Sequence, residues 1–185
     1  MWAERLLERY YQHSRYTYDI LLTHSKAVAE KAVKIAQDLK STPLDIEFIY
    51  NSAILHDIGI FMTYSEKLEC YGRYPYITHG YWGSEILISE GLIRYARVCE
   101  THVGVGLTVD DIKAMKLPIP PKDMSPVTFE EKIVCYADKF FSKKRGSLTS
   151  EIPLAHVREQ IRGYGEEKLK RFDELHRLFN PHGCD

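Results

Sequence analysis

The feature that most constrains this sequence of 185 residues is a helical spacing of apolar side chains, which recurs along most of the chain. Between residues 17 and 39 the apolar positions lie three, four or seven residues apart: Leu21, Val28, Ala32, Ile35 and Leu39. Side chains at this spacing share one face of an α-helix. Residues 44–57 repeat the pattern, whereas no window shows the sustained alternation of several β-strands and no fixed-period repeat is found. The sequence therefore predicts an all-α bundle.

Caps and helix breakers divide the rest of the chain. We expect further helices over residues 79–89, 93–103, 128–143 and 153–179, and a short helix that begins at Thr108. Gly163 and Gly165 mark a candidate break within the last of these helices. Residues 61–76 are irregular and rich in tyrosine, and residues 117–126 hold four prolines, so both segments are predicted to be loops.

Composition limits the classes of protein to consider. Apolar residues make up 44% of the chain, charged residues 28%, and the formal charge is −1. This balance excludes an intrinsically disordered chain and a protein whose main work is coating nucleic acid. No apolar run approaches the roughly 18 residues of a membrane span, and the first residues lack the apolar core of a signal peptide. The four cysteines lie far apart without a CxxC pair, which indicates reduced thiols and a cytoplasmic protein.

Histidines and aspartates on apolar helix faces are the main candidates for chemistry. His24, His56 and His102 each stand at helical spacing from apolar residues of their own predicted helices. Asp57 directly follows His56, and Asp138 ends a further apolar run. Several such groups are costly to bury without a shared partner, and a divalent cation is such a partner, because imidazole and carboxylate suit iron, manganese, zinc or nickel. The other histidines are interpreted as surface or packing residues: His13, His156, His176 and His182.

The segment around His56 carries a more specific pattern. Residues 53–59 read Ala-Ile-Leu-His-Asp-Ile-Gly, with His24 upstream and Tyr136-Ala137-Asp138 downstream. This arrangement resembles the HD-domain superfamily of metal-dependent phosphohydrolases and its HDIG signature. The resemblance covers roughly residues 17–147. It implies one HD domain over residues 1–185, with its core at about 17–147 and a C-terminal helix at 153–179 packing on that core.

Two further histidines resemble the extra ligand segments of the HD subgroup that holds two metals. His79 opens a predicted helix, and His102 precedes Val103 and Gly104. The resemblance assigns the first ion to His24, His56, Asp57 and Asp138. It assigns the second ion to Asp57, His79 and His102, with Asp57 bridging the two. The expected cofactors are therefore two divalent transition metal ions, drawn from iron, manganese, nickel and zinc.

Phosphoester cleavage at such a centre needs an activated water and a cation for the phosphate. Bound metal ions lower the pKa of water toward neutrality and bind phosphoryl oxygens, which makes the bridging Asp57 a catalytic residue. Many two-metal relatives carry a lysine or arginine directly after HDIG, but Ile60 stands there in this chain. Lys139 follows the last ligand, and Arg145 lies two turns along the predicted helix from Asp138. Lys139 and Arg145 are therefore predicted to contact the phosphate.

The leading interpretation is a metal-dependent phosphohydrolase, either a phosphomonoesterase or a phosphodiesterase, acting on a nucleotide or another small phosphoester. Two alternatives remain open. Some superfamily members use the same six ligands for a di-iron centre that activates oxygen, and other HD domains only bind nucleotides. The expected partner is a small-molecule phosphoester, with no membrane and no stable nucleic-acid partner. The sequence leaves the oligomeric state open.

Overall fold

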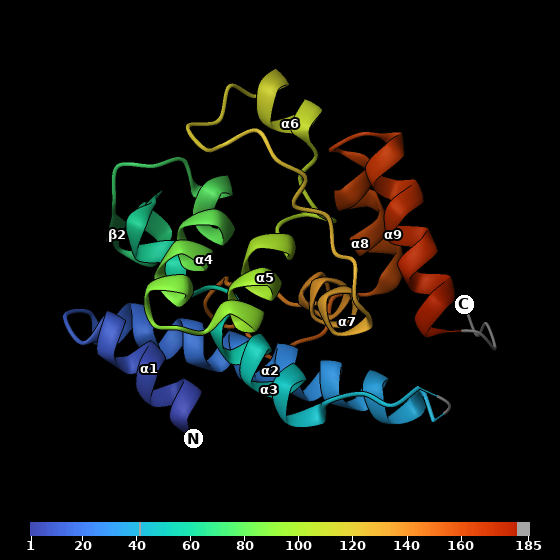
Figure 1. The fold of residues 1–185 in the computed structure, drawn as a ribbon, viewed down its shortest axis with the longest axis horizontal. Coiled ribbons are helices and arrows are strands. Elements are labelled where there is room, and N and C mark those ends of the chain that lie inside the picture. Colours follow the sequence, from blue (N-terminus) through green and yellow to red (C-terminus); the bar gives the residue numbers. More distant parts are fainter. Residues whose placement is uncertain (41, 181–185) are drawn as a thin grey trace.

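A computed structural model describes residues 1–40 and 42–180, and the fold over these residues is all-α, as the sequence predicts. Figure 1 shows the arrangement of the helices. Their bounds are α1 Trp2–Tyr11, α2 Arg15–Asp38, α3 Ile46–Leu55, α4 His79–Ser89, α5 Ile93–Thr101, α6 Val109–Ala114, α7 Phe129–Asp138, α8 Leu154–Arg162 and α9 Glu166–Phe179. The interpretation of His182 as a surface or packing residue concerns a position outside the described residues.

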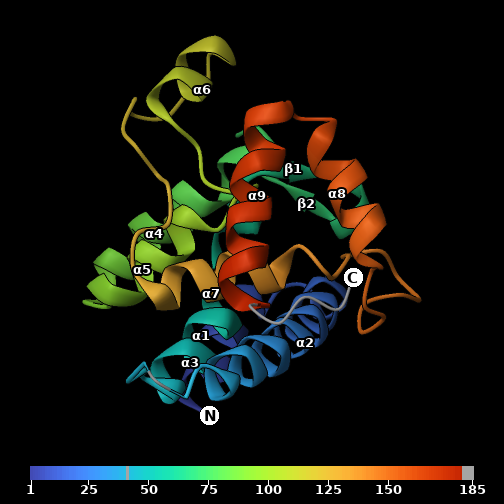
Figure 2. The same ribbon diagram turned by 90° about the vertical axis from the view of Figure 1, so that its right-hand side faces the viewer.

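The segment between α3 and α4 is irregular, as predicted, but it contains short ordered elements. Three 3₁₀ turns are η1 Ile58–Met62, η2 Glu66–Leu68 and η3 Tyr76–Thr78. Strands β1 Tyr64–Ser65 and β2 Cys70–Tyr71 pair antiparallel, with Tyr64 opposite Tyr71. Figure 1 shows β2 on the opposite side of the molecule from α8 and α9, so in the turned view of Figure 2 the hairpin lies behind these helices.

One helix ends earlier than expected, one helix was not predicted, and one predicted break is confirmed. The helix predicted over residues 128–143 ends at Asp138 as α7, so the next residues follow a different path. Helix α1 has no counterpart among the predicted helices, and it buries Ala3, Leu7 and Tyr11. The predicted break at Gly163 and Gly165 separates α8 from α9.

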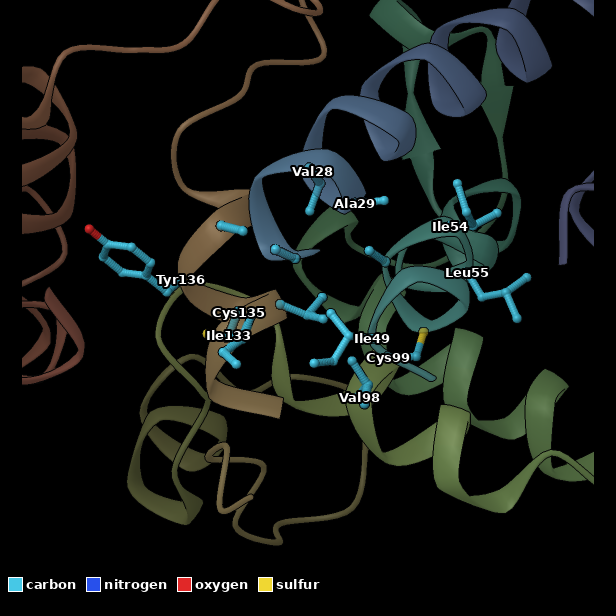
Figure 3. Close-up of a cluster of buried hydrophobic side chains, with 14 of the residues drawn as sticks. Val28, Ala29, Ile49, Ile54, Leu55, Val98, Cys99, Ile133, Cys135 and Tyr136 are labelled. Atoms are coloured by element: carbon cyan, nitrogen blue, oxygen red, sulfur yellow. The ribbon is translucent and has the colours of Figure 1, made fainter. Parts of the chain in front are cut away.

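The main hydrophobic core lies between α2, α3, α5 and α7. Figure 3 shows Val28 and Ala29 of α2 and Ile49 of α3 close to Val98 of α5 and Ile133 of α7. These five side chains are almost completely buried, at 0–1% exposure. Burying a side chain of this kind contributes roughly 1.5–3 kcal/mol for valine or isoleucine. Polar residues carried by the same four helices therefore sit in a rigid, close-packed frame.

The C-terminal helices pack on α7 through aromatic side chains. Phe172 of α9 is fully buried, and its ring stacks on Tyr136 with centroids 5.5 Å apart. The Tyr136 hydroxyl lies 2.7 Å from Nδ1 of His176, which gives that histidine the packing role expected for it. Tyr136 points from α7 toward these helices (Figure 3).

Helix α6 stands apart from the main core, at the top of Figure 1. A second, smaller core anchors it to the chain on both sides of the helix: Val103, Leu107, Ile112, Ile119 and Met124. Lys168 of α9 donates hydrogen bonds to Asp111 of α6 and, over 2.9 Å, to the carbonyl of Gly106. Among the described helices, none combines the length and the apolar character needed to cross a membrane.

Candidate metal centre

The six predicted metal ligands meet in the interior, although they come from five helices. His24 lies within α2, His56 and Asp57 directly follow α3, and His79 is the first residue of α4. His102 directly follows α5, and Asp138 is the last residue of α7. All six side chains are buried. The core packing of these helices therefore brings together residues up to 114 positions apart in sequence.

One cluster of donors gathers around Asp138 and one oxygen of Asp57. Nε2 of His24 lies 3.1 Å from Asp138 Oδ1 and 3.5 Å from Asp57 Oδ2. Nε2 of His56 lies 3.4 Å from the same Asp138 oxygen and 3.1 Å from the same Asp57 oxygen. These four residues are the ones assigned to the first ion.

The second cluster gathers around the other oxygen of Asp57. Nε2 of His79 lies 2.9 Å from Nε2 of His102. Asp57 Oδ1 lies 3.2 Å from the His79 nitrogen and 3.5 Å from the His102 nitrogen. Asp57 therefore presents one carboxylate oxygen to each cluster, which is the bridging arrangement expected from the resemblance.

Backbone carbonyls orient three of the four imidazoles. Nδ1 of His56 donates to the carbonyl of Ala53 over 2.5 Å, Nδ1 of His79 to Tyr76 over 2.7 Å, and Nδ1 of His102 to Cys99 over 2.6 Å. A carbonyl only accepts, so each Nδ1 carries a proton, and Nε2 is the nitrogen that faces the cluster. Each acceptor is three residues before its histidine, which is possible because all three histidines stand at a helix end. Such a bond is the usual outer contact of a metal-binding histidine.

The donor set fits divalent cations. With metal–ligand distances of about 2.0–2.2 Å, neighbouring ligand atoms lie about 3.0–3.4 Å apart, which matches both clusters. Both oxygens of Asp57 and Nε2 of His56 are buried and make no hydrogen bond, although Asp57 Oδ2 forms an ion pair with Lys143 over 2.7 Å. Buried polar atoms of this kind need a partner. His24 with His56 and Asp138 forms one metal-sized group, and His56 with Asp57 and His102 forms another. The distances to Asp57 Oδ1 place His79 in the second group.

Electrostatics keep most of the site in the protonation states that metals require. Burial lowers the pKa of His24 to about 4 and that of His102 to about 3, so both imidazoles are neutral at pH 7. Burial raises the pKa of the Asp57 carboxyl, but the nearby His56 and Lys143 outweigh this effect and hold that pKa well below its usual range. Burial lowers the pKa of His56, but Asp57 and Asp138 outweigh that effect and raise it to about 9. Metal binding must therefore displace a proton from His56.

Close backbone packing places His79 above Asp57, and Gly59 makes it possible. A Cβ atom at Gly59, the last residue of the HDIG motif, would overlap the backbone nitrogen of Gly83 and the carbonyl oxygen of His79. A Cβ at Gly83 would overlap the sulfur of Cys99 on α5. The two glycines therefore allow η1, α4 and α5 to approach closely enough for the second cluster to form.

Helix α1 also supports the site, a contribution that the sequence analysis missed. The Tyr11 hydroxyl donates to the carbonyl of Ile58 over 3.0 Å and accepts from the amide of Phe61 over 3.1 Å. These bonds fix the chain directly after Asp57. The signal in the sequence was the spacing of Ala3, Leu7 and Tyr11 on one helix face.

Three of the basic residues that follow α7 occupy different places. Lys143 was not predicted, yet its Nζ lies 2.7 Å from Asp57 Oδ2. Nζ of Lys139 lies 2.7 Å from Asp138 Oδ2 and donates to the carbonyl of His102 over 3.0 Å. Arg145 is exposed, and its guanidinium lies 5.9 Å from the centre of the Tyr16 ring. The structure therefore brings Lys139 and Lys143 to the site but leaves Arg145 outside it.

A cavity of about 770 Å³ opens beside the second cluster. Its lining includes His79, His102, Asp138, Lys139 and Lys143, but not Arg145. The remaining predicted surface histidines are elsewhere, since His13 and His156 are exposed. The arrangement combines paired metal-type donor clusters, a bridging carboxylate, an adjoining ammonium group and room for a small molecule.

A helical bundle with buried histidine and aspartate donors from five helices defines the class of HD-type metal proteins. Residues 21–142 match the HD domain family, and the chain belongs to that family. The HD domain of the phosphodiesterase PgpH from L. monocytogenes has the same fold, with a TM-score of 0.55 and 18% identity over 95% of this chain and 97% of that one.

Similar sequences come from archaea. An uncharacterised protein of Methanocaldococcus jannaschii is 36% identical over 166 residues, which cover 85% of this chain and 89% of that protein. A tRNA (cytidine(56)-2'-O)-methyltransferase of Thermoplasma volcanium is 34% identical over 164 residues, 88% of this chain and 42% of that enzyme. A protein of the same name from Picrophilus torridus is 34% identical over 128 residues, 69% of this chain and 33% of that enzyme. The chain thus spans about two fifths or less of the methyltransferases that it matches.

Proposed function

We propose that this HD-domain protein is a metal-dependent phosphohydrolase acting on a small phosphoester. The observation that carries the proposal is Asp57, whose two oxygens face two separate imidazole clusters within 3.1–3.5 Å. The proposed cofactors are two divalent ions, iron, manganese, nickel or zinc, held by His24, His56, Asp57 and Asp138 and by Asp57, His79 and His102. Ions bound there supply an acidified water and a positive charge for phosphoryl oxygens.

The chain's own residues have distinct proposed roles. Lys143 lines the cavity beside Asp57, so its ammonium group is placed to bind a phosphoryl oxygen and to supply the cation that Ile60 cannot. Lys139 holds one oxygen of Asp138, so that the other faces His24 and His56. We assign it a positioning role. Arg145 is no longer a candidate for phosphate contact, because it does not line the cavity.

The methyltransferase names of two relatives favour a different reaction. The chain spans less than half of those enzymes, and buried imidazole–carboxylate clusters serve metal binding. We therefore propose hydrolysis for this domain. The proposed partner is a small molecule rather than nucleic acid, and buried free thiols at Cys70, Cys99 and Cys135 support a reducing, cytoplasmic location.

The test removes metal and then restores it. Purified protein is stripped with a chelator, and phenyl phosphate and bis(p-nitrophenyl) phosphate are assayed after separate addition of Mn²⁺, Fe²⁺, Ni²⁺ or Zn²⁺. We expect no hydrolysis by the stripped protein and recovery with at least one ion, and the preferred ester separates a monoesterase from a diesterase. Unchanged hydrolysis after stripping would contradict the proposal. A mixed-valence iron signal after anaerobic purification, without hydrolysis, would favour the oxygenase instead.

A further inference from the structure

The cavity beside the second cluster extends well beyond the metal ligands. Its volume of about 770 Å³ is several times that of a phosphate group, and pockets of roughly 300–1,000 Å³ hold whole drug-sized molecules. Part of the lining comes from the segment between α5 and α6, and part from α8, far along the chain. A phosphoester whose phosphate lies at His79, His102 and Lys143 would therefore leave most of this space to its ester group.

The walls of that space are largely apolar. Val103 and Leu107 line it from the segment that follows α5, and Val157 and Ile161 line it from α8. These four side chains are buried, with 1–8% exposure. Phe141, which lies between Leu107 and Val157 in the sequence, also lines the cavity. Binding of a neutral apolar group to such a surface is favourable, because apolar surface leaves water. A charged group would be desolvated there without a compensating partner, which is unfavourable.

Each lysine of the cavity lies against a carboxylate, and Lys143, beside Asp57, is the one proposed to bind a phosphoryl oxygen. Lys139 lies against Asp138, Lys143 against Asp57, and Lys168 against Asp111. Among the described residues that line the cavity there is no arginine. A chain of two or three phosphates requires several unpaired cations or donors. The lining therefore provides for one phosphoryl group at the metal centre and not for a polyphosphate.

We propose that this cavity selects phosphomonoesters that carry a single phosphoryl group and an uncharged, apolar ester group, an alkyl or aryl phosphate rather than a nucleoside polyphosphate. The inference rests on the proposed function, which it makes more specific. Val103, Leu107, Val157 and Ile161 are the specificity-determining residues.

The first test measures affinity along a series of n-alkyl phosphonates, which cannot be hydrolysed, from ethyl to octyl, with Mn²⁺-loaded protein in a calorimeter. Each methylene group that enters the cavity should lower the Kd about fourfold. The same series of alkyl phosphates should show a matching rise in kcat/KM. ATP should bind more weakly than octyl phosphonate. A Kd that does not change with chain length, or ATP as the tightest ligand, would overturn the inference.

A surface variant tests the charge argument without disturbing the core. Met115 lines the cavity and is 51% exposed, so Met115→Lys adds an unpaired cation there. We expect it to tighten ATP binding several-fold and to leave ethyl phosphonate unchanged. Ile93→Lys is the matched control, because Ile93 is 61% exposed and lies outside the cavity. Equal effects of the two variants would contradict the proposed role of the paired lysines.

Phosphonate binding and ester hydrolysis, measured on the same protein, test the inference and the proposed function separately. Hydrolysis of ethyl and phenyl phosphate, together with a flat phosphonate series, would leave the phosphohydrolase standing and overturn the apolar specificity. Graded phosphonate binding without hydrolysis of any ester would support the apolar site and overturn the phosphohydrolase.

Discussion

At the scale of single residues, Asp57 joins the two halves of the metal centre. Its carboxylate is fully buried, and its oxygens are the atoms that the two imidazole clusters share. A buried carboxylate in this position is stable only with cations around it. Lys143 supplies one such charge, and bound metals would supply the rest.

Removing the negative charge of Asp57 should remove the metals. Asp57→Asn keeps the shape of the side chain but weakens both sites, so we expect metal affinity to fall at least about a hundredfold, beyond the loss usual for outer-shell changes. Elemental analysis after dialysis measures the effect. Asp110→Asn changes an exposed aspartate and serves as the control. Full metal content in Asp57→Asn would show that the bridge is assigned wrongly.

Lys143 should act on the substrate rather than on metal content. Lys143→Met is expected to retain both metals and to lower kcat/KM by about 10²–10³, the loss seen when one preorganised donor to a developing charge is removed. Lys144→Met, an exposed neighbour, should behave like the wild type. Steady-state kinetics with phenyl phosphate and metal analysis of the same samples decide the matter. Unaltered kinetics in Lys143→Met would remove this residue from the mechanism.

At the scale of elements, the ends of helices place the ligands. His79 starts α4, while His56 and His102 follow the last turns of α3 and α5. The close approach of α4 to η1 depends on Gly59, because any side chain there meets backbone atoms. Backbone atoms cannot move aside as the tip of a flexible side chain can.

An alanine at this glycine should therefore disturb the second cluster. We expect Gly59→Ala to lower the melting temperature by several degrees, since overpacking costs about 1–3 kcal/mol, and to reduce metal content toward one ion per chain. Gly163→Ala is a suitable control, because Gly163 has right-handed helical dihedrals away from the metal ligands. Calorimetry and elemental analysis report the two effects separately. Wild-type stability in Gly59→Ala would mean that the close approach is not required.

Helix α6 is tied to α9 by one charged contact, and this contact should depend on pH. Burial raises the pKa of Asp111, but its contacts with Lys168 and Thr108 outweigh this effect and lower the pKa below its ordinary value of 3.8. A group whose pKa is lower in the folded state stabilises that state above its ordinary pKa. The contribution is therefore present at pH 7 and is lost as the pH falls below about 4.

Replacing Lys168 should remove the ion pair with Asp111 at neutral pH as well. Lys168→Met is expected to speed amide hydrogen exchange in α6 about fivefold, the effect of an ion pair worth about 1 kcal/mol. Lys170→Met, on an exposed position of α9, should leave exchange unchanged. The two variants should converge as the pH falls through the lowered pKa of Asp111. Equal exchange rates in both variants at pH 7 would show that the ion pair does not hold α6.

The sequence predicted which histidines and aspartates lie together, but not which basic side chains lie beside them. Helical spacing and the HDIG resemblance predicted all six donors, which lie together in the structure. The prediction that this helix continues to residue 143 was wrong, since α7 ends at Asp138. The sequence did not show this end, because no glycine or proline directly follows Asp138. The helix-face argument therefore pointed to Arg145, whereas the turn brings Lys143 to Asp57. Where a helix ends under tertiary packing is not encoded in a local pattern.

At the scale of the whole molecule, the two donor clusters belong to different parts of the bundle. His24, His56 and Asp138 come from α2, α3 and α7, while His79 and His102 come from α4 and α5. The C-terminal helices pack on α7 and complete the cavity, so that residues of α8 face the metal centre. Each cluster should therefore be removable without loss of the other.

Counting metals per chain tests this arrangement most directly. Protein purified in Mn²⁺ and dialysed is analysed for metal in the wild type, in His79→Ala, in His102→Ala and in the control His156→Ala, whose histidine is exposed. We expect about two ions in the wild type and control and about one in each of the other two, with hydrolysis falling steeply, because two-metal phosphoryl transfer uses both ions. One ion per chain in fully active wild-type protein, unchanged in His79→Ala and His102→Ala, would contradict the two-metal centre.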